Sequence, residues 1–145
     1  VLRFGRGLIA AGLMLCQPLA SVAVCSSANP EAFEPFLKRF RSEQPFAVQR
    51  TVLPLKFLRW EYGADAQGRD ESGTVESQIS AADYAQWPVL NQRMQQEGLL
   101  LRVKSRQARA VQLQVFQEGT DYLISYHFKQ EAGCWVFWLY EDHSL

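Results

Sequence analysis

Residues 111–140, VQLQVFQEGTDYLISYHFKQEAGCWVFWLY, decide the fold class. Apolar and polar side chains alternate over 111–115 and again over 122–129, which is the period of a strand with one buried face. The last seven residues are apolar on both faces, which predicts a central or covered strand. Gly119 and Gly133 separate these runs and are typical of turns. The stretch therefore predicts an antiparallel meander.

Helices and a further hairpin are expected before this meander. Apolar residues at the spacing of one helix face follow Asn29 and Pro30, a pair that suits a helix start. They are Phe33, Phe36, Leu37 and Phe40. A second, short helical segment is expected near 45–51. Residues 53–61 and 74–79 then form a predicted hairpin around a polar, glycine-containing loop.

A mainly helical stretch connects the hairpin to the meander. Ser80 and Asp83 form a variant of the capping box, and residues 89–97 continue as helix up to Gly98. Helices followed by an antiparallel sheet predict an α+β fold in which the helices pack on one face of a curved sheet. The chain has 145 residues, which allows one such domain, over 31–145.

The N-terminus has the pattern of a secretory signal peptide. Arg3 and Arg6 precede a short apolar run, and small residues stand where a peptidase would cut after Ala23. We therefore expect residues 1–23 to be removed, residues 24–30 to form a linker, and the domain to be periplasmic. Removal leaves 13 basic and 15 acidic residues. A retained membrane anchor is the alternative.

Several fates of Cys25 stay open. The run ending in Val24-Cys25 loosely resembles the lipobox of bacterial lipoproteins, in which the cysteine is lipidated and anchors the protein to the membrane. A cut after Ala28 would remove Cys25 altogether. In an oxidising compartment Cys25 could form a disulfide with Cys134. Otherwise Cys134 is a small buried apolar residue and Cys25 is free.

Short segments at both ends of the domain carry a family resemblance. They are FEPFLKRF (33–40), FAVQR (46–50), LPL (53–55), YHFK (126–129) and EDHS (141–144), with Gly133 and Trp135. Together they resemble a bacterial family of exported proteins of unknown function, over most of residues 31–144. Proteins of this kind are similar to the nuclear-transport-factor-2-like (cystatin-like) cone, in which a curved sheet wraps around helices. That fold hosts enzymes, binding modules and immunity proteins, so it implies no single function.

The candidate ligand-binding residues are Arg50, Trp60, Trp87, Tyr126 and His127. An arginine can hold a carboxylate through two parallel hydrogen bonds. Flat aromatic rings give contact area at a low entropic cost, and a histidine can act as a general base near neutral pH. Each residue type also has a structural interpretation: a half-buried salt bridge, a core ring, or a hydrogen-bonded surface group.

Charge and motifs exclude several classes of function. The chain has 15 basic and 15 acidic residues, which argues against a nucleic-acid partner. The loop over 62–73 lacks the regular acidic spacing of a calcium loop. Paired zinc ligands, a phosphate loop and a nucleophile elbow are absent from the sequence, so we expect no metal and no cofactor.

Two functions remain as hypotheses. The first is a non-enzymatic binding module for a protein, an envelope component or a small apolar ligand, with an immunity protein as one form. The second is a small isomerase or hydrolase of the same fold that uses His127 or Asp83. Convergence of His127, Asp83 and Arg50 in one cavity would favour the enzyme.

Overall fold

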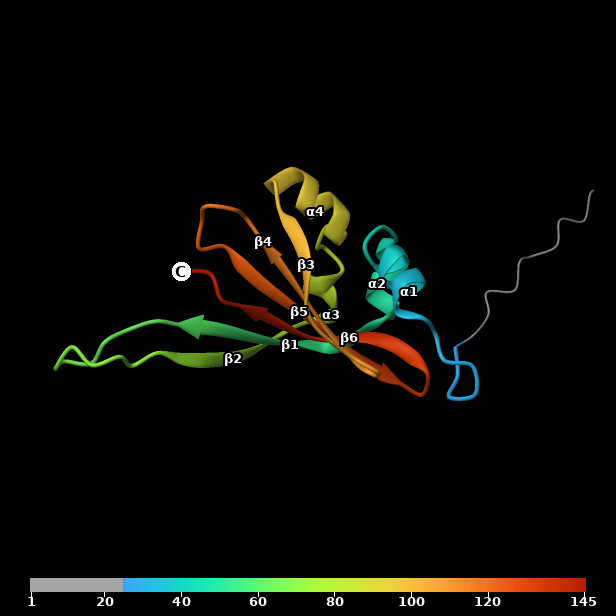
Figure 1. Cartoon of the computed structure of the whole chain (residues 1–145), viewed down its shortest axis with the longest axis horizontal. Helices are drawn as coiled ribbons and strands as arrows, with labels where there is room; N and C mark the ends of the chain where they lie inside the picture. The colour runs from blue at the N-terminus through green and yellow to red at the C-terminus, as the bar shows by residue number, and fades with distance from the viewer. Residues whose placement is uncertain (1–24) are drawn as a thin grey trace, which may run out of the picture.

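The computed structural model describes residues 25–145, which form a curved six-stranded sheet with helices on one face (Figure 1). In chain order the elements are α1 (Phe33–Phe40), α2 (Gln44–Gln49), β1 (Thr51–Glu61), β2 (Gly73–Ile79), α3 (Ala81–Tyr84), α4 (Leu90–Glu97), β3 (Leu100–Gln107), β4 (Ala110–Phe116), β5 (Leu123–Glu131) and β6 (Cys134–Asp142). The strand order is β2-β1-β6-β5-β4-β3. The expected signal peptide and its cleavage after Ala23 lie outside the described residues.

The α+β class is confirmed, but the expectation of an antiparallel sheet fails at one pairing. β1 and β2 form the predicted antiparallel hairpin, β4 to β6 form the predicted meander, and β3 extends it by one antiparallel strand beside β4. β1 and β6 are parallel, with Phe57 opposite Tyr140. A strand alternation predicts which face a side chain takes, but it holds no information about the direction of a neighbour from the other end of the chain.

The helices differ in detail from the sequence expectations. α1 begins at Phe33 after Ala32, so the predicted start at Asn29 and Pro30 was wrong; Asn29 instead closes a turn with Ser26. At α3, Ser80 Oγ accepts from the Asp83 amide at 3.1 Å, as the capping pattern predicted. No helix in residues 25–145 is both long and apolar enough to cross a membrane.

Aromatic packing joins the first helix to the inner face of the sheet, which is the face that the helices cover (Figure 1). Phe36 on α1, Phe128 on β5 and Phe137 on β6 are fully buried. The Phe36 and Phe128 ring centroids lie 5.6 Å apart, and the planes are nearly perpendicular. Burial of each ring contributes about 1.5–3 kcal/mol, so these contacts fix where α1 sits.

A bulge interrupts the alternation of the last strand. Strict alternation along 134–140 predicts that Trp138 and Tyr140 share one face and that Phe137 lies on the other. Instead Phe128 pairs with Phe137 while His127 pairs with Leu139, so Trp138 is the extra residue. As a result Phe137 and Tyr140 both pack on the inner face. The predicted alternation of β6 was wrong beyond Phe137, although its central position is confirmed.

Candidate functional site

A pocket of about 480 Å³ lies between the inner face of the sheet and α4. Its apolar wall consists of Phe57 on β1, Ile79 at the end of β2, and Trp87 with Pro88 between α3 and α4. The rest of the lining carries polar groups and consists of Arg93, Glu97, Tyr126, Tyr140 and Asp142. An apolar cavity with a few converging polar groups is the form that small-molecule sites take.

Four aromatic rings hold the pocket in shape. The ring centroid of Tyr140 lies 5.6 Å from that of Phe57, 5.1 Å from that of Trp87 and 5.3 Å from that of Tyr126. The last two contacts are edge-to-face, the arrangement that aromatic quadrupoles favour. Tyr140 therefore connects three separate elements to one site. Because it occupies this position only after the Trp138 bulge, the bulge is part of how the pocket forms.

Arg93 is the polar centre of the pocket. Its Nη1 donates to Tyr140 Oη at 2.9 Å and to Tyr126 Oη at 3.2 Å, and its Nη2 donates to the Tyr122 hydroxyl. Nε lies 3.4 Å from Glu97 Oε1, one helical turn further along α4. The Arg93 side chain is 19% exposed. A guanidinium has five fixed donors, and here one side chain organises three hydroxyls and a carboxylate.

The hydroxyls around Arg93 stay protonated at neutral pH. Burial raises the pKa of Tyr122 to about 12, and raises the pKa values of Tyr126 and Tyr140 above their ordinary range. The positive charge of Arg93 works against this rise and does not cancel it. The pocket therefore presents neutral hydroxyl groups rather than phenolates.

A second polar cluster occupies the outer face of the sheet. Glu141 on β6 accepts from Trp60 Nε1 at 3.0 Å, and its other oxygen lies 2.7 Å from His127 Nε2. His143 stacks on Trp60 with ring centroids 5.6 Å apart, and its Nε2 lies 3.5 Å from the same Glu141 oxygen. Burial disfavours ionisation of Glu141, but the contacts from Trp60 and His127 outweigh it and hold the pKa of Glu141 below its ordinary value.

This outer cluster does not have the geometry of a hydrolase. The Ser125 hydroxyl lies 3.4 Å from His143 Nε2, the same nitrogen that faces Glu141. A catalytic triad needs the serine hydroxyl and the carboxylate to bond different nitrogens of the histidine ring. Ser125 is also completely buried, so its oxygen cannot reach a substrate. The cluster is a set of mutually satisfied hydrogen bonds.

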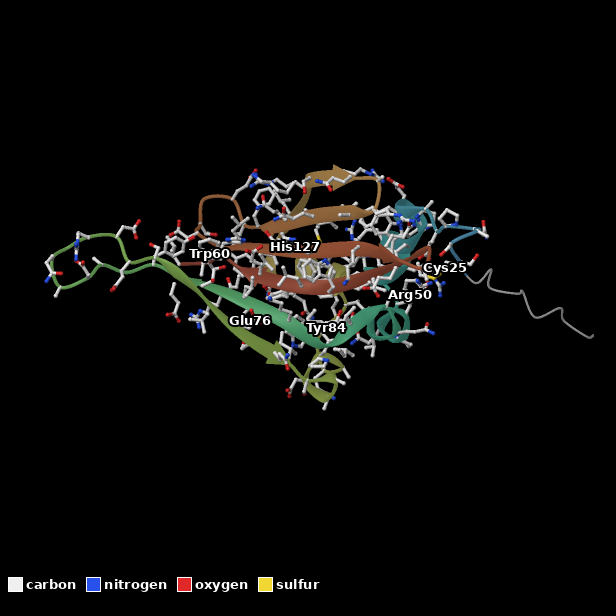
Figure 2. All side chains as sticks on the ribbon, turned by 90° about the horizontal axis from the view of Figure 1, so that it is seen from below. Cys25, Arg50, Trp60, Glu76, Tyr84 and His127 are labelled. Carbon is white, nitrogen blue, oxygen red and sulfur yellow. A yellow bond between two sulfur atoms is a disulfide. The ribbon has the colours of Figure 1, made fainter. Side chains whose placement is uncertain are left out.

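The third predicted position lies at the other end of the sheet. Figure 2 shows Arg50 next to Cys25, away from both Trp60 and His127. Arg50 Nη1 lies 3.2 Å from Glu31 Oε2, with both side chains less than a fifth exposed. Cys25 forms a disulfide with Cys134 across 109 positions of sequence. The arginine thus takes the half-buried salt-bridge arrangement that was one of its two interpretations.

Gly133 explains how the segment after Cys25 reaches this end. Its φ is +84°, which an L side chain rarely adopts. A Cβ at this position would also lie 1.9 Å from the Ser26 carbonyl oxygen. A turn with any side chain at 133 would therefore push the N-terminal segment away from the disulfide.

The five predicted ligand-binding residues separate into three places. The pocket brings Trp87 and Tyr126 together, Trp60 and His127 meet through Glu141 on the outer face, and Arg50 lies at the disulfide end. Asp83 is an exposed helix-capping residue that bonds Ser80. His127, Asp83 and Arg50 therefore do not converge in one cavity.

The sequence interpretation missed Arg93 and Glu97. The segment NQRMQQE around them is polar, so an arginine and a glutamate four residues apart resemble an exposed ion pair. A signal was present: Leu90 is buried, and positions 93, 94 and 97 share its helix face. An arginine on the buried face of a short helix indicates that hydrogen-bond acceptors for its guanidinium lie beneath the helix.

Comparison with solved structures identifies the fold. An NTF2-like protein from Bacteroides fragilis superposes with a TM-score of 0.56 at 19% identity, over 80% of this chain and 48% of that one. The chain has the nuclear-transport-factor-2-like fold. It spans about half the length of the Bacteroides protein. This confirms the family of folds that the sequence resembles, and at this identity it extends to the fold alone.

Two further structures resemble the chain more distantly. A protein from Bacteroides uniformis covers 79% of this chain and 77% of its own length, at 14% identity and a TM-score of 0.47. An NTF-2 like protein of unknown function from Silicibacter pomeroyi covers 74% of this chain and 84% of its own, at 9% identity and a TM-score of 0.34. No family model and no curated protein matches the sequence.

Proposed function

We propose that the chain is an exported, non-enzymatic binding module whose inner pocket takes a small apolar ligand. The observation that carries this proposal is the pocket of about 480 Å³ between β1, β6 and α4, with Phe57 and Trp87 on its wall. A cavity of that size and lining suits a small molecule rather than a protein side chain.

Two observations support export. The N-terminal residues have the charge and apolar pattern of a signal peptide. A disulfide such as that between Cys25 and Cys134 is typical of proteins that fold in an oxidising compartment. This disulfide also bears on processing, because lipidation would need the Cys25 sulfur atom and a cut after Ala28 would remove it. The proposal therefore takes cleavage after Ala23 without lipidation.

The proposal gives no catalytic role to His127 or Asp83. A general base must lie within hydrogen-bond reach of a bound substrate. Neither residue lines the inner pocket: His127 bonds Glu141 on the outer face and Asp83 caps α3.

Binding is tested with the neutral dye Nile red and the chain that begins at Val24. We expect dye fluorescence to rise on binding, and Trp87→Ala to weaken the affinity about tenfold or more, because a lost aromatic contact is worth roughly 1.5–3 kcal/mol. Trp138→Ala is the matched control, since this tryptophan lies on the outer face. Equal effects of the two substitutions would overturn the pocket as the site.

Export is tested by producing the full chain in a Gram-negative host and measuring the mass of the protein in the periplasmic extract. We expect a product that begins at Val24 and carries no free thiol at Cys25 or Cys134. Incorporation of labelled palmitate at Cys25 would contradict the proposed processing.

A further inference from the structure

Two tyrosine hydroxyls in the pocket have an unused hydrogen-bond donor. Tyr126 and Tyr140 are each 5% exposed, and each hydroxyl accepts a hydrogen bond from Arg93. Because a guanidinium can only donate, each phenolic proton needs a different acceptor. The structure gives neither proton an acceptor among residues 25–145. Tyr122 is different, since its hydroxyl also donates to Glu97 Oε2 at 3.4 Å.

Both unused donors belong to the wall of the inner pocket. Tyr126 and Tyr140 line the same pocket as Phe57, Trp87 and Pro88. A donor on the wall of a cavity can bond a ligand that brings an acceptor, and such a hydrogen bond contributes about 0.5–1.5 kcal/mol. The pocket is therefore suited to a ligand that brings an oxygen acceptor into a cavity with four aromatic rings in its lining.

The charges of the lining argue against an anionic ligand. Arg93 is the single cation among the lining residues, and Glu97 lies 3.4 Å from it. Asp142 adds a second carboxylate to the lining. The lining thus holds one guanidinium and two carboxylates, and its net negative charge disfavours an incoming carboxylate, which would also have to lose its hydration.

We propose that the pocket binds an uncharged, largely apolar molecule whose carbonyl oxygen accepts hydrogen bonds from Tyr126 and Tyr140. This inference rests on the proposed function and adds the chemical class of the ligand. The aromatic wall holds the apolar body of the ligand, the paired hydroxyls fix its orientation, and the two carboxylates select against an anion of the same shape.

Three probes with one naphthalene body test the proposal by equilibrium dialysis against the chain from Val24. They are 2-acetylnaphthalene, with a carbonyl; 2-ethylnaphthalene, without an acceptor; and 2-naphthoate, with a charge. We expect the ketone to bind about three- to tenfold more tightly than the ethyl compound, the usual range for a hydrogen bond. We expect it to bind at least tenfold more tightly than the naphthoate.

Three substitutions separate the donors from the charge. Tyr140→Phe and Tyr126→Phe should each reduce the preference for the ketone over the ethyl compound by about threefold, because each removes one of the two donors. Asp142→Asn should raise the affinity of the naphthoate relative to that of the ketone about threefold or more, because it removes one of the two carboxylates of the lining. If Tyr126→Phe does not fold, Tyr140→Phe carries the test.

The outcomes separate the chemical class of the ligand from the existence of a binding pocket. Tighter binding of the naphthoate, or equal binding of the ketone and ethyl compound with no effect of Tyr140→Phe, overturns the ligand class and keeps a binding pocket. Absence of binding for all three probes, or binding that is insensitive to Trp87→Ala, overturns the proposed function and this inference together.

Discussion

The two faces of the central strands carry clusters of the same kind, one charged side chain among aromatic residues, with opposite outcomes. On the inner face Arg93 donates to three tyrosine hydroxyls, and two of those hydroxyls keep a free proton beside a cavity. On the outer face Glu141 accepts from Trp60 and His127, and none of these three residues lines the inner pocket. The difference teaches that residue type alone does not mark a binding site; the unused hydrogen-bonding capacity next to a cavity does.

The largest difference in stability between the two faces should come from substituting two neighbouring residues of β6. Phe137→Ala removes a fully buried ring and should lower the free energy of unfolding by about 3–5 kcal/mol. Trp138→Ala, one position later on the bulge, should lower it by about 1 kcal/mol, because its ring is partly solvent-exposed. Urea unfolding followed by circular dichroism measures both. Similar losses would mean that the bulge does not divide the faces as described.

The second-largest difference in stability should come from substituting the charged residue at the centre of each cluster. Arg93→Met leaves three hydroxyls and Glu97 without their shared partner. It should lower the free energy of unfolding by about 3 kcal/mol, as the loss of one partner from a buried charged network does. Glu141→Gln keeps an oxygen acceptor for the outer donors and should cost about 1 kcal/mol. The midpoints of urea unfolding compare the two variants. A larger loss for Glu141→Gln would place the more demanding network on the outer face.

The inner face should lose stability in alkali. The folded pKa of Tyr122 is about 12, above its ordinary value of 10.0. The contribution of the protonated Tyr122 hydroxyl to the free energy of unfolding is therefore fully present below pH 10 and is lost as the pH rises towards 12. Tyr122→Phe should reduce this alkaline loss by about 1 kcal/mol, a figure lowered for partial exposure. Thermal melts between pH 8 and pH 11 test this, and a wild type and variant with parallel profiles would contradict it.

The smallest expected effect is a loss of stability in acid that comes from the outer face. The folded pKa of Glu141 lies below its ordinary value of 4.5. Its contribution is therefore present above pH 4.5 and is lost as the pH falls further through the folded pKa. We expect Glu141→Gln to flatten the acid limb of the stability profile by less than about 1 kcal/mol. The control is Tyr122→Phe, whose acid limb should match that of the wild type.

Much of the fold could be predicted from local pattern. The spacing of Phe33, Phe36 and Phe40 identified α1, and alternation identified β4 and β5, because these patterns reflect one buried face of a single element. The parallel pairing of β1 with β6 could not be predicted this way, since it joins strands from opposite ends of the domain. The pocket could be predicted only in part for the same reason. Trp87 and Tyr126 were identified as aromatic candidates, but Arg93 lies in a polar helix whose sequence gives no direct sign of a buried site.

The sequence by itself determined the class of fold, the central position of the last strand and the abundance of aromatic rings, because periodicity and side-chain type are local properties. Only the tertiary structure decided which rings face a cavity, which cation reaches them and which hydroxyls keep an unused proton. These depend on a one-residue bulge at Trp138 and on the placement of α4 over β5 and β6. Both are settled by packing between elements that lie far apart in the chain, where a shift of one residue reverses the face of every side chain that follows.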